Sequence, residues 1–168
     1  SEKELKKEAI NNSFNDKNFI LIIAPRNLKR KNHIEETGRK YGLNTSYWSE
    51  KKEIEFPKLI IINEFGLLSD LYYFSDLNFV GGTTKNIGGH SIIEPQFSGK
   101  PLIYGPDVRN FKNISDMFIE NHCGRVINDS KDVSRFIKEI EDEEIKIRIS
   151  ENSKKIIKLS LTRFFFLD

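Results

Sequence analysis

The chain has 168 residues, which is enough for one domain with a hydrophobic core. Its 27 Lys and Arg residues stand against 25 Asp and Glu residues. The resulting net charge of +2 argues against nucleic-acid-binding proteins, which present a strongly basic face. The single cysteine, Cys123, excludes an internal disulfide framework and indicates a reducing compartment. The sequence shows neither a signal peptide nor an apolar run of about 18 residues, so it predicts no membrane-spanning helix.

Short apolar runs alternate along the chain with segments of helical periodicity. From the amino end, the pattern predicts a helix over residues 2–11, a strand over 19–24, a helix over 31–41, and strands over 44–48 and 58–62. A helix over 66–74, a strand over 77–80, a helix over 91–98 and a strand over 102–104 follow. The last predicted elements are a helix over 110–122, a strand over 124–127, and helices over 130–142 and 143–160. This alternation predicts an α/β fold with a parallel sheet. The unbroken apolar run at 19–24 is typical of a strand covered on both faces.

The residues that could bind a ligand follow the carboxyl ends of the predicted strands, where ligands bind in open α/β sheets. They form four segments, which are Pro25-Arg26-Asn27, Asn63-Glu64-Phe65-Gly66, Gly81 to His90, and Gly105-Pro106-Asp107. Because the carboxyl ends of parallel strands meet at one edge of a sheet, we expect these segments to lie close together.

The Gly-rich segment from Gly81 to His90 is the sharpest signal in the sequence. Its four glycines precede a predicted helix that starts near Ser91. Free backbone N–H groups at such a start bind anions, and glycine lets a phosphate approach the backbone. His90 adds a donor, and the Glu94 carboxylate suits the vicinal hydroxyls of a ribose. The alternative is that the glycines only form turns, since neither the dinucleotide fingerprint nor the P-loop pattern occurs.

Arg26 directly follows a buried strand, so its guanidinium is expected to face the same crevice and to hold a phosphate or a carboxylate. The alternative is a surface arginine paired with a nearby acid. His33 and His122 lack metal-ligand spacing, and no Ser/His/Asp grouping is recognisable. The sequence therefore predicts an anion site without a metal.

The stretch from Asp76 to Lys112 reads DLNFVGGTTKNIGGHSIIEPQFSGKPLIYGPDVRNFK. It closely resembles the donor-domain signature of the Kdo transferases, bacterial glycosyltransferases that attach 3-deoxy-D-manno-octulosonic acid (Kdo) to the lipid A precursor. That signature carries A-D-x-x-F-V-G-G-S, then G-G-H-N-x-x-E-P, then G-K-P-x-x-x-G-P, and then N-F. Upstream, Pro25-Arg26 resembles the family's P-R-H, and Asn63 to Leu68 resembles its D-T-M-G-E-L. The resemblance covers about residues 19 to 140.

The resemblance implies a two-domain GT-B fold whose C-terminal domain binds CMP-Kdo on a Rossmann-like parallel sheet with helices on both faces. Residues 1–168 are expected to be this single nucleotide-sugar-binding domain, without the N-terminal acceptor domain. Carried over by position, the residues expected to contact CMP are Pro25, Arg26, Phe65, Gly66, Leu67, Ser91, Ile92, Ile93 and Glu94. The loop residues Gly88, Gly89 and His90 join them on the physical argument above. The family's catalytic base is a Glu of the N-terminal domain, so no catalytic residue is assigned here, and no metal or cofactor is expected.

The resemblance also implies partners and a location. The expected function is Kdo transfer from CMP-Kdo to the lipid A precursor, lipid IVA, in lipopolysaccharide biosynthesis, with this chain supplying the donor half. The acceptor is met through the N-terminal domain. The expected location is peripheral, at the cytoplasmic face of the bacterial inner membrane, and no nucleic acid is expected as a partner. The alternatives are another GT-B enzyme that uses a UDP-sugar, and a non-catalytic or degenerate fragment. The run from Phe164 to Phe166 suits either a neighbouring domain or a membrane surface.

The sequence departs from the family pattern at three positions. Asn27 replaces the His of P-R-H, Leu67 replaces the Glu of G-E-L, and Ser91 replaces the Asn of G-G-H-N. Each change removes or shortens a polar contact, which predicts weaker donor binding. The family's first strand also has no counterpart here. In the order 3-2-1-4-5-6 we expect its loss to leave a gap of about 10 Å between strands 19–24 and 58–62.

Overall fold

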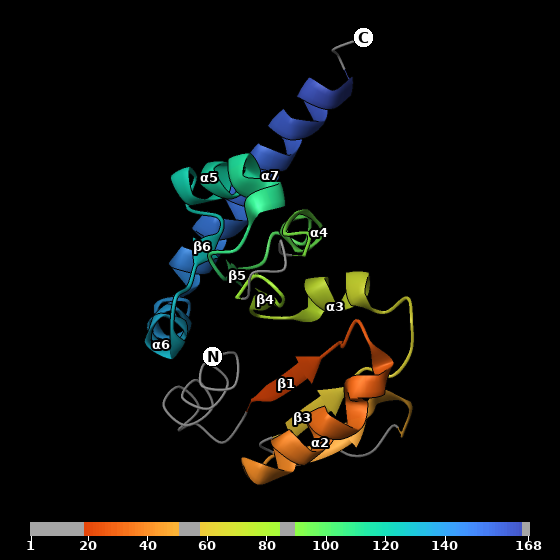
Figure 1. The fold of residues 1–168 in the computed structure, drawn as a ribbon. Coiled ribbons are helices and arrows are strands. Elements are labelled where there is room, and N and C mark those ends of the chain that lie inside the picture. The colour runs from red at the N-terminus through yellow and green to blue at the C-terminus, as the bar shows by residue number, and fades with distance from the viewer. Residues whose placement is uncertain (1–18, 51–57, 85–89, 166–168) are drawn as a thin grey trace. The chain divides into compact units, whose positions relative to one another are not determined.

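The computed structural model describes residues 19–50, 58–84 and 90–165 (Figure 1). The helix predicted over residues 2–11 lies outside these ranges. The described residues form two compact units, residues 19–68 and residues 69–165. Each unit is built on its own three-stranded parallel sheet. That residues 1–168 make one domain stays a prediction.

The unit of residues 19–68 contains the first sheet, and every strand predicted in it is confirmed. Its elements are β1 (Ile20–Ile23), η1 (Leu28–Arg30), α2 (Lys31–Lys40), β2 (Asn44–Tyr47), η2 (Trp48–Glu50) and β3 (Lys58–Ile61). The strand order is β1-β3-β2, and all pairs are parallel. Its buried core is Leu43, Leu59 and Ile61. A methyl group on Gly38 of α2 would collide with the Leu59 side chain, so glycine lets this helix approach β3 closely.

The expected gap between strands 19–24 and 58–62 is wrong. β1 pairs directly with β3, with Ile20 opposite Lys58 and Ile23 opposite Ile61. The error came from counting the strand at 44–48 as part of the 3-2-1-4-5-6 order. β2 is instead an additional edge strand beyond β3, so β3 and β1 correspond to the third and second strands of that order. The first strand of the order has no counterpart among the described strands.

The prediction that the run 19–24 is covered on both faces is also wrong. Burial alternates along β1, and Ile20 and Ile22 are 40% and 39% exposed. β1 pairs within its sheet only with β3, at one end of the order β1-β3-β2. The apolar run therefore predicted the strand correctly, but not its cover, because strands in the middle and at the end of a sheet share the same composition.

The unit of residues 69–165 contains the second sheet. Its elements are α3 (Leu68–Phe74), β4 (Asn78–Val80), α4 (Ile93–Gln96), β5 (Leu102–Tyr104), η3 (Arg109–Phe111), α5 (Lys112–Glu120), β6 (Arg125–Val126), α6 (Ser130–Glu139) and α7 (Glu143–Phe165). The order is β4-β5-β6 in parallel, so β5 lies in the middle and is completely buried. Within the described ranges, no helix combines the length and the apolar character that a membrane span requires. The side chains of Phe164 to Phe166 lie outside the description.

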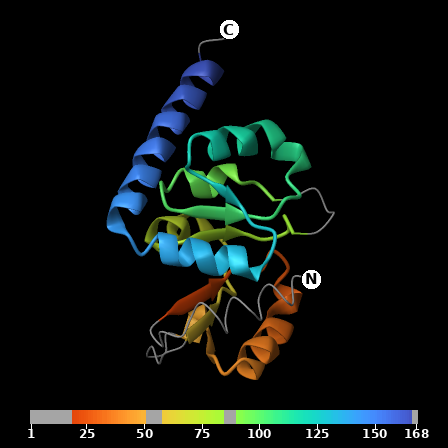
Figure 2. The ribbon, with the colours of Figure 1, turned by 90° about the vertical axis from the view of Figure 1, so that its left-hand side faces the viewer.

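Helices cover both faces of this second sheet, as predicted. Successive residues of β5 point to opposite faces. Tyr104 belongs to a core cluster with Phe118 of α5, whereas Ile103 belongs to another with Phe136 of α6. Figure 2 shows β5 between these two helices. The long helix α7 contributes to both clusters, through Ile156 in the first and through Ile149 in the second.

Replacing Ile103 by alanine is expected to lower the free energy of unfolding by about 2–5 kcal/mol, because its buried side chain would leave a cavity between β5 and α6. The measurement is urea unfolding followed by circular dichroism. The matched control is Ile147→Ala on α7, since that side chain is 57% exposed and its loss should cost less than about 0.5 kcal/mol. Equal losses in the two variants would contradict the assigned core.

Candidate functional site

The loops after β1 and β3 emerge at the same edge of the first sheet, because the two strands are parallel neighbours with Ile23 opposite Ile61. Pro25 follows β1 and is half-buried, and Arg26 beyond it is exposed. Within residues 19–50, 58–84 and 90–165, the Arg26 guanidinium has neither an ion-pair nor a hydrogen-bond partner. The alternative of a surface arginine paired with an acid therefore finds no support in this part of the chain.

Two asparagines fix the backbone of these loops. The Asn27 side-chain oxygen accepts a hydrogen bond of 3.0 Å from the Lys29 N–H, which caps the start of η1. The Asn63 side chain, which follows β3, donates a hydrogen bond of 2.8 Å to the Ser49 hydroxyl. Both side-chain amides therefore make hydrogen bonds within the protein. They fix the backbone of the loop that contains Arg26 and of the loop after β3.

The turn after β3 presents an aromatic ring. Phe65 is 83% exposed, and Gly66 next to it has a φ of +90°, which favours glycine. Leu67 is half-buried before α3 begins. Three residues predicted to contact the nucleotide, Phe65 to Leu67, therefore lie at the same edge of the sheet as Arg26. A nucleobase can stack on an exposed ring of this kind.

In the second unit, one buried hydroxyl joins the loops after β4 and β5. The Thr83 Oγ1 donates a hydrogen bond of 2.7 Å to the Val80 carbonyl and accepts one of 2.7 Å from the Gly105 N–H. The Thr83 carbonyl accepts a further bond of 2.8 Å from the Asp107 N–H. Thr83 is completely buried. The Gly81–Thr84 turn is therefore attached to the Gly105–Asp107 loop rather than free at the surface.

Two glycines are required by close contacts in these loops. A methyl group on Gly105 would collide with the Thr83 backbone, lying 2.6 Å from its carbonyl carbon. Gly82 has a φ of +76°, and a methyl group there would lie 3.0 Å from two atoms of the His90 ring. The His90 imidazole thus packs against the Gly82 backbone, at the position where sequence reasoning placed a donor for an anion.

The helix expected over residues 91–98 is a single turn, Ile93–Gln96, and this corrects the anion argument. Four residues sum few peptide dipoles, so a helix macrodipole contributes little here. The Ser91 Oγ also accepts a hydrogen bond of 3.3 Å from the Ile93 N–H, which occupies one of the amides expected to be free. The helix is short because the chain continues from Gln96 in tight turns to Gly99, whose φ of +68° cannot belong to a right-handed helix.

The remaining predicted site residues of this unit differ in exposure. Ile92 is completely buried in the core, so it has only backbone atoms to offer a ligand. Glu94 is exposed, and its carboxylate has no hydrogen-bond or ion-pair partner among the described residues. Burial, with a smaller effect of the Glu94 charge, raises the pKa of the Tyr72 hydroxyl. Glu94 therefore stands near Tyr72 with both carboxylate oxygens available.

Other predictions about the site lie beyond what the structure tests. Gly88 and Gly89 fall outside the described residues. The contact between Arg26 and the Gly81–Glu94 segment, which a shared cradle requires, stays a prediction. Searched over the described residues alone, the chain has no group of three His, Cys, Asp or Glu side chains placed to hold a metal ion.

Sequence reasoning missed Thr83. The residue type gave no catalytic signal, and a threonine after two glycines reads as an ordinary turn residue. A signal was nevertheless present. A hydroxyl next to the end of a buried strand can form hydrogen bonds with backbone groups that have no partner in the sheet. The residue is structural, and it positions the loop that carries the chemical groups.

No protein-family model matches the chain. Comparison with individual proteins, however, identifies relatives. A bifunctional glycosyltransferase/methyltransferase of Fusobacterium nucleatum subsp. nucleatum is 32% identical over 155 residues, which cover 88% of this chain and 24% of that protein. A 3-deoxy-D-manno-octulosonic acid transferase of Aquifex aeolicus is 28% identical over 136 residues, which cover 81% of this chain and 37% of that protein. The chain thus spans well under half the length of these curated relatives.

A solved structure is similar in fold. The crystal structure of the C-terminal CMP-Kdo binding domain of WaaA from Acinetobacter baumannii matches with a TM-score of 0.83 at 24% identity. The match covers 93% of this chain and 82% of that one. This similarity confirms the predicted Rossmann-like α/β class.

Replacing Thr83 by valine is expected to lower the free energy of unfolding by about 1–3 kcal/mol, because the buried Gly105 N–H loses its acceptor. The measurement is urea unfolding followed by circular dichroism. The adjacent residue supplies a matched control, since the buried Thr84 Oγ1 has no hydrogen-bond partner among the described residues. Thr84→Val should therefore be neutral or stabilising, and a Thr84 variant as unstable as the Thr83 variant would refute the bridge.

Proposed function

Since this chain is a relative of the Kdo transferases, we propose that it forms the half of such a glycosyltransferase that binds the CMP-Kdo donor. In this proposal the enzyme transfers Kdo to a lipid A precursor during lipopolysaccharide biosynthesis. The observation that carries the proposal is the Arg26 guanidinium, exposed without an acid partner in the described chain, in the loop that follows strand β1. An arginine in this position suits the phosphate of CMP, because its fork of N–H donors matches two phosphate oxygens.

The other loop residues complete the proposed recognition of CMP. His90 beside Gly82 is a second donor for the phosphate, and the free Glu94 carboxylate accepts hydrogen bonds from the two ribose hydroxyls. The exposed Phe65 ring offers a surface for the cytosine base. These roles use the exposed Phe65 and Glu94 and the half-buried His90, and they leave the buried Ile92 and Thr83 to hold the loops in place.

The proposed chemistry divides between this chain and an acceptor domain. A hydroxyl group of the acceptor forms the new glycosidic bond to the anomeric carbon of Kdo, while the bond from that carbon to the phosphate oxygen breaks and CMP leaves with the electron pair. The hydroxyl proton passes to a base of the acceptor domain. Arg26 and His90 stabilise the negative charge that grows on the departing phosphate. The acceptor is proposed to be lipid IVA at the cytoplasmic face of the inner membrane.

Two alternatives from the sequence remain testable beside this proposal. A GT-B enzyme that uses a UDP-sugar would bind UMP or UDP in preference to CMP. A degenerate fragment would bind no nucleotide, and the replacements at Asn27, Leu67 and Ser91 led to that alternative. Calorimetric titration of the chain with CMP, UMP and UDP at millimolar concentrations separates all three cases.

Replacing Arg26 by alanine is expected to weaken CMP binding by about tenfold, because one charge-assisted pair with the phosphate is lost. The measurement is isothermal titration of the chain with CMP. Arg39→Ala is the matched control, since Arg39 lies on α2 and pairs with Glu35 at 2.6 Å. Equal affinities of the two variants, or tighter binding of UDP than of CMP by the unchanged chain, would count against the proposal.

Replacing Glu94 by glutamine is expected to reduce the discrimination between CMP and 2′-deoxy-CMP. The unchanged chain should prefer CMP by about tenfold, because its carboxylate accepts a hydrogen bond from the 2′-hydroxyl. In the variant the two ligands should bind with nearly equal affinity. A preference that persists unchanged in Glu94→Gln would show that another group reads the ribose.

A further inference from the structure

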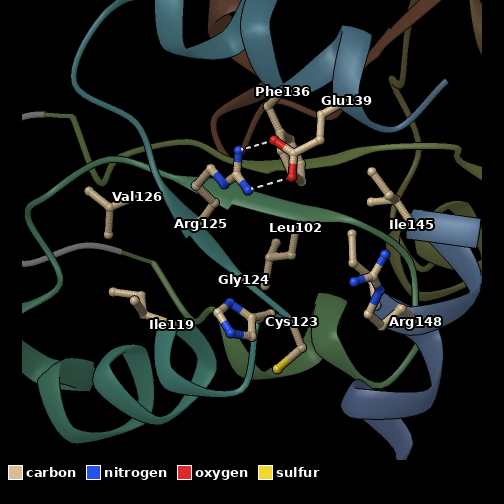
Figure 3. A pocket seen from close by; sticks show the side chains of 12 residues that line it. Leu102, Ile119, Cys123, Gly124, Arg125, Val126, Phe136, Glu139, Ile145 and Arg148 are labelled. Atoms are coloured by element: carbon tan, nitrogen blue, oxygen red, sulfur yellow. Dashed lines mark hydrogen bonds and ion pairs between the residues drawn. The ribbon is translucent and has the colours of Figure 1, made fainter. Parts of the chain in front are cut away.

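A cavity of about 430 Å³ lies in the unit of residues 69–165, at the edge where β5 and β6 begin (Figure 3). Leu102 and Arg125, the first residues of these strands, both line it. The loops that contain Thr83 and Gly105 follow the opposite ends of β4 and β5. The cavity is therefore separate from the candidate donor loops, on the other edge of the same sheet.

The lining is apolar over much of its extent. Leu102 of β5, Ile119 of α5, Phe136 of α6 and Ile145 of α7 contribute to it, so four elements of the unit border one open space. Ile119 is 43% exposed although it lies beside buried residues. A volume of this size falls in the range of sites for small organic molecules, which bury an apolar body and fix it with few polar groups.

Of the two arginines in the lining, one is paired with an acid and the other is not. Arg125 makes two hydrogen bonds to the Glu139 carboxylate, at 2.5 Å and 2.7 Å, and its guanidinium lies 4.5 Å from the centre of the Phe136 ring. Figure 3 shows Arg148 of α7 on the other side of Leu102 from this pair. Among the described residues, the Arg148 guanidinium has no ion-pair or hydrogen-bond partner. One positive charge is therefore left over in the lining.

We propose that this cavity binds a small amphipathic carboxylate. Its apolar stem packs on the partly exposed Ile119 and Ile145, and its carboxylate accepts hydrogen bonds from the Arg148 guanidinium. An imidazole N–H of His122, which also lines the cavity and lacks a side-chain partner in the described chain, supplies a further donor.

The charge of the lining selects the head group. Arg125 and Glu139 cancel, so a ligand with one negative charge balances Arg148. A phosphate monoester carries about 1.5 to 2 negative charges at neutral pH, which exceeds the one positive charge that the exposed Arg148 supplies. A cation would be repelled by the same arginine. A single carboxylate is the head group that satisfies both conditions.

Titration of the chain with three probes tests this inference, with affinities read from chemical shifts of the amide groups around the cavity. Octanoate should bind, octylammonium with the same stem and the opposite charge should not, and acetate without a stem should not. Arg148→Gln should weaken octanoate binding by about tenfold. Ile119→Glu, a change at a partly exposed position, should abolish it by repelling the carboxylate.

The matched control is Arg135→Gln on α6, since Arg135 pairs with Asp132 and does not line the cavity. It should leave octanoate affinity unchanged, and Arg148→Gln should leave CMP affinity unchanged. The inference is overturned if octanoate does not bind, if octylammonium binds equally well, or if both arginine variants keep the affinity of the unchanged chain.

Discussion

The Thr83 hydroxyl is the contact on which the candidate loops of the second sheet depend. It satisfies the Val80 carbonyl and the Gly105 N–H at once, and the Thr83 carbonyl takes the Asp107 N–H. Backbone groups at the ends of buried strands need such partners, because leaving them unpaired away from water is costly. The close contact that results excludes any side chain at Gly105. The turn that carries Gly82, against which His90 packs, is thereby fixed to the middle strand of the sheet.

Parallel pairing gives the two edges of this sheet different chemistry. β5 is buried along its whole length, so groups that meet a ligand come from beyond its ends. Beyond the carboxyl ends lie the half-buried His90, which packs against Gly82, and the exposed Glu94. At the amino ends, apolar residues enclose a cavity beside the unpaired Arg148. We therefore propose one edge for a polar nucleotide and the other for an apolar stem with one charge.

Much of the fold was predictable from the sequence, because apolar runs and helical periodicity report local structure directly. Every strand predicted within the described ranges is present, and so is every helix, although the helix expected at 91–98 is only one turn. Which strands pair with one another was harder to predict from the sequence. Nothing in the run Ile20 to Ile23 tells that its partner is β3 rather than a missing strand, since pairing depends on residues far apart in sequence. For the same reason the bridge that Thr83 makes between two loops was not predictable.

The three departures from the family pattern have different consequences in the structure. Asn27 and Ser91 each use a side-chain oxygen to accept a hydrogen bond from a backbone amide two residues further along, Lys29 in one loop and Ile93 in the other. Such local bonds stabilise turns, so both replacements suit the backbone of the loops they occupy. Leu67 is half-buried and offers no polar group in exchange for the glutamate that it replaces. Among these three positions, the argument for a degenerate site therefore rests on Leu67. At Asn27 and Ser91 the loops beside Arg26 and Glu94 keep an ordered backbone path, as the proposed nucleotide site requires.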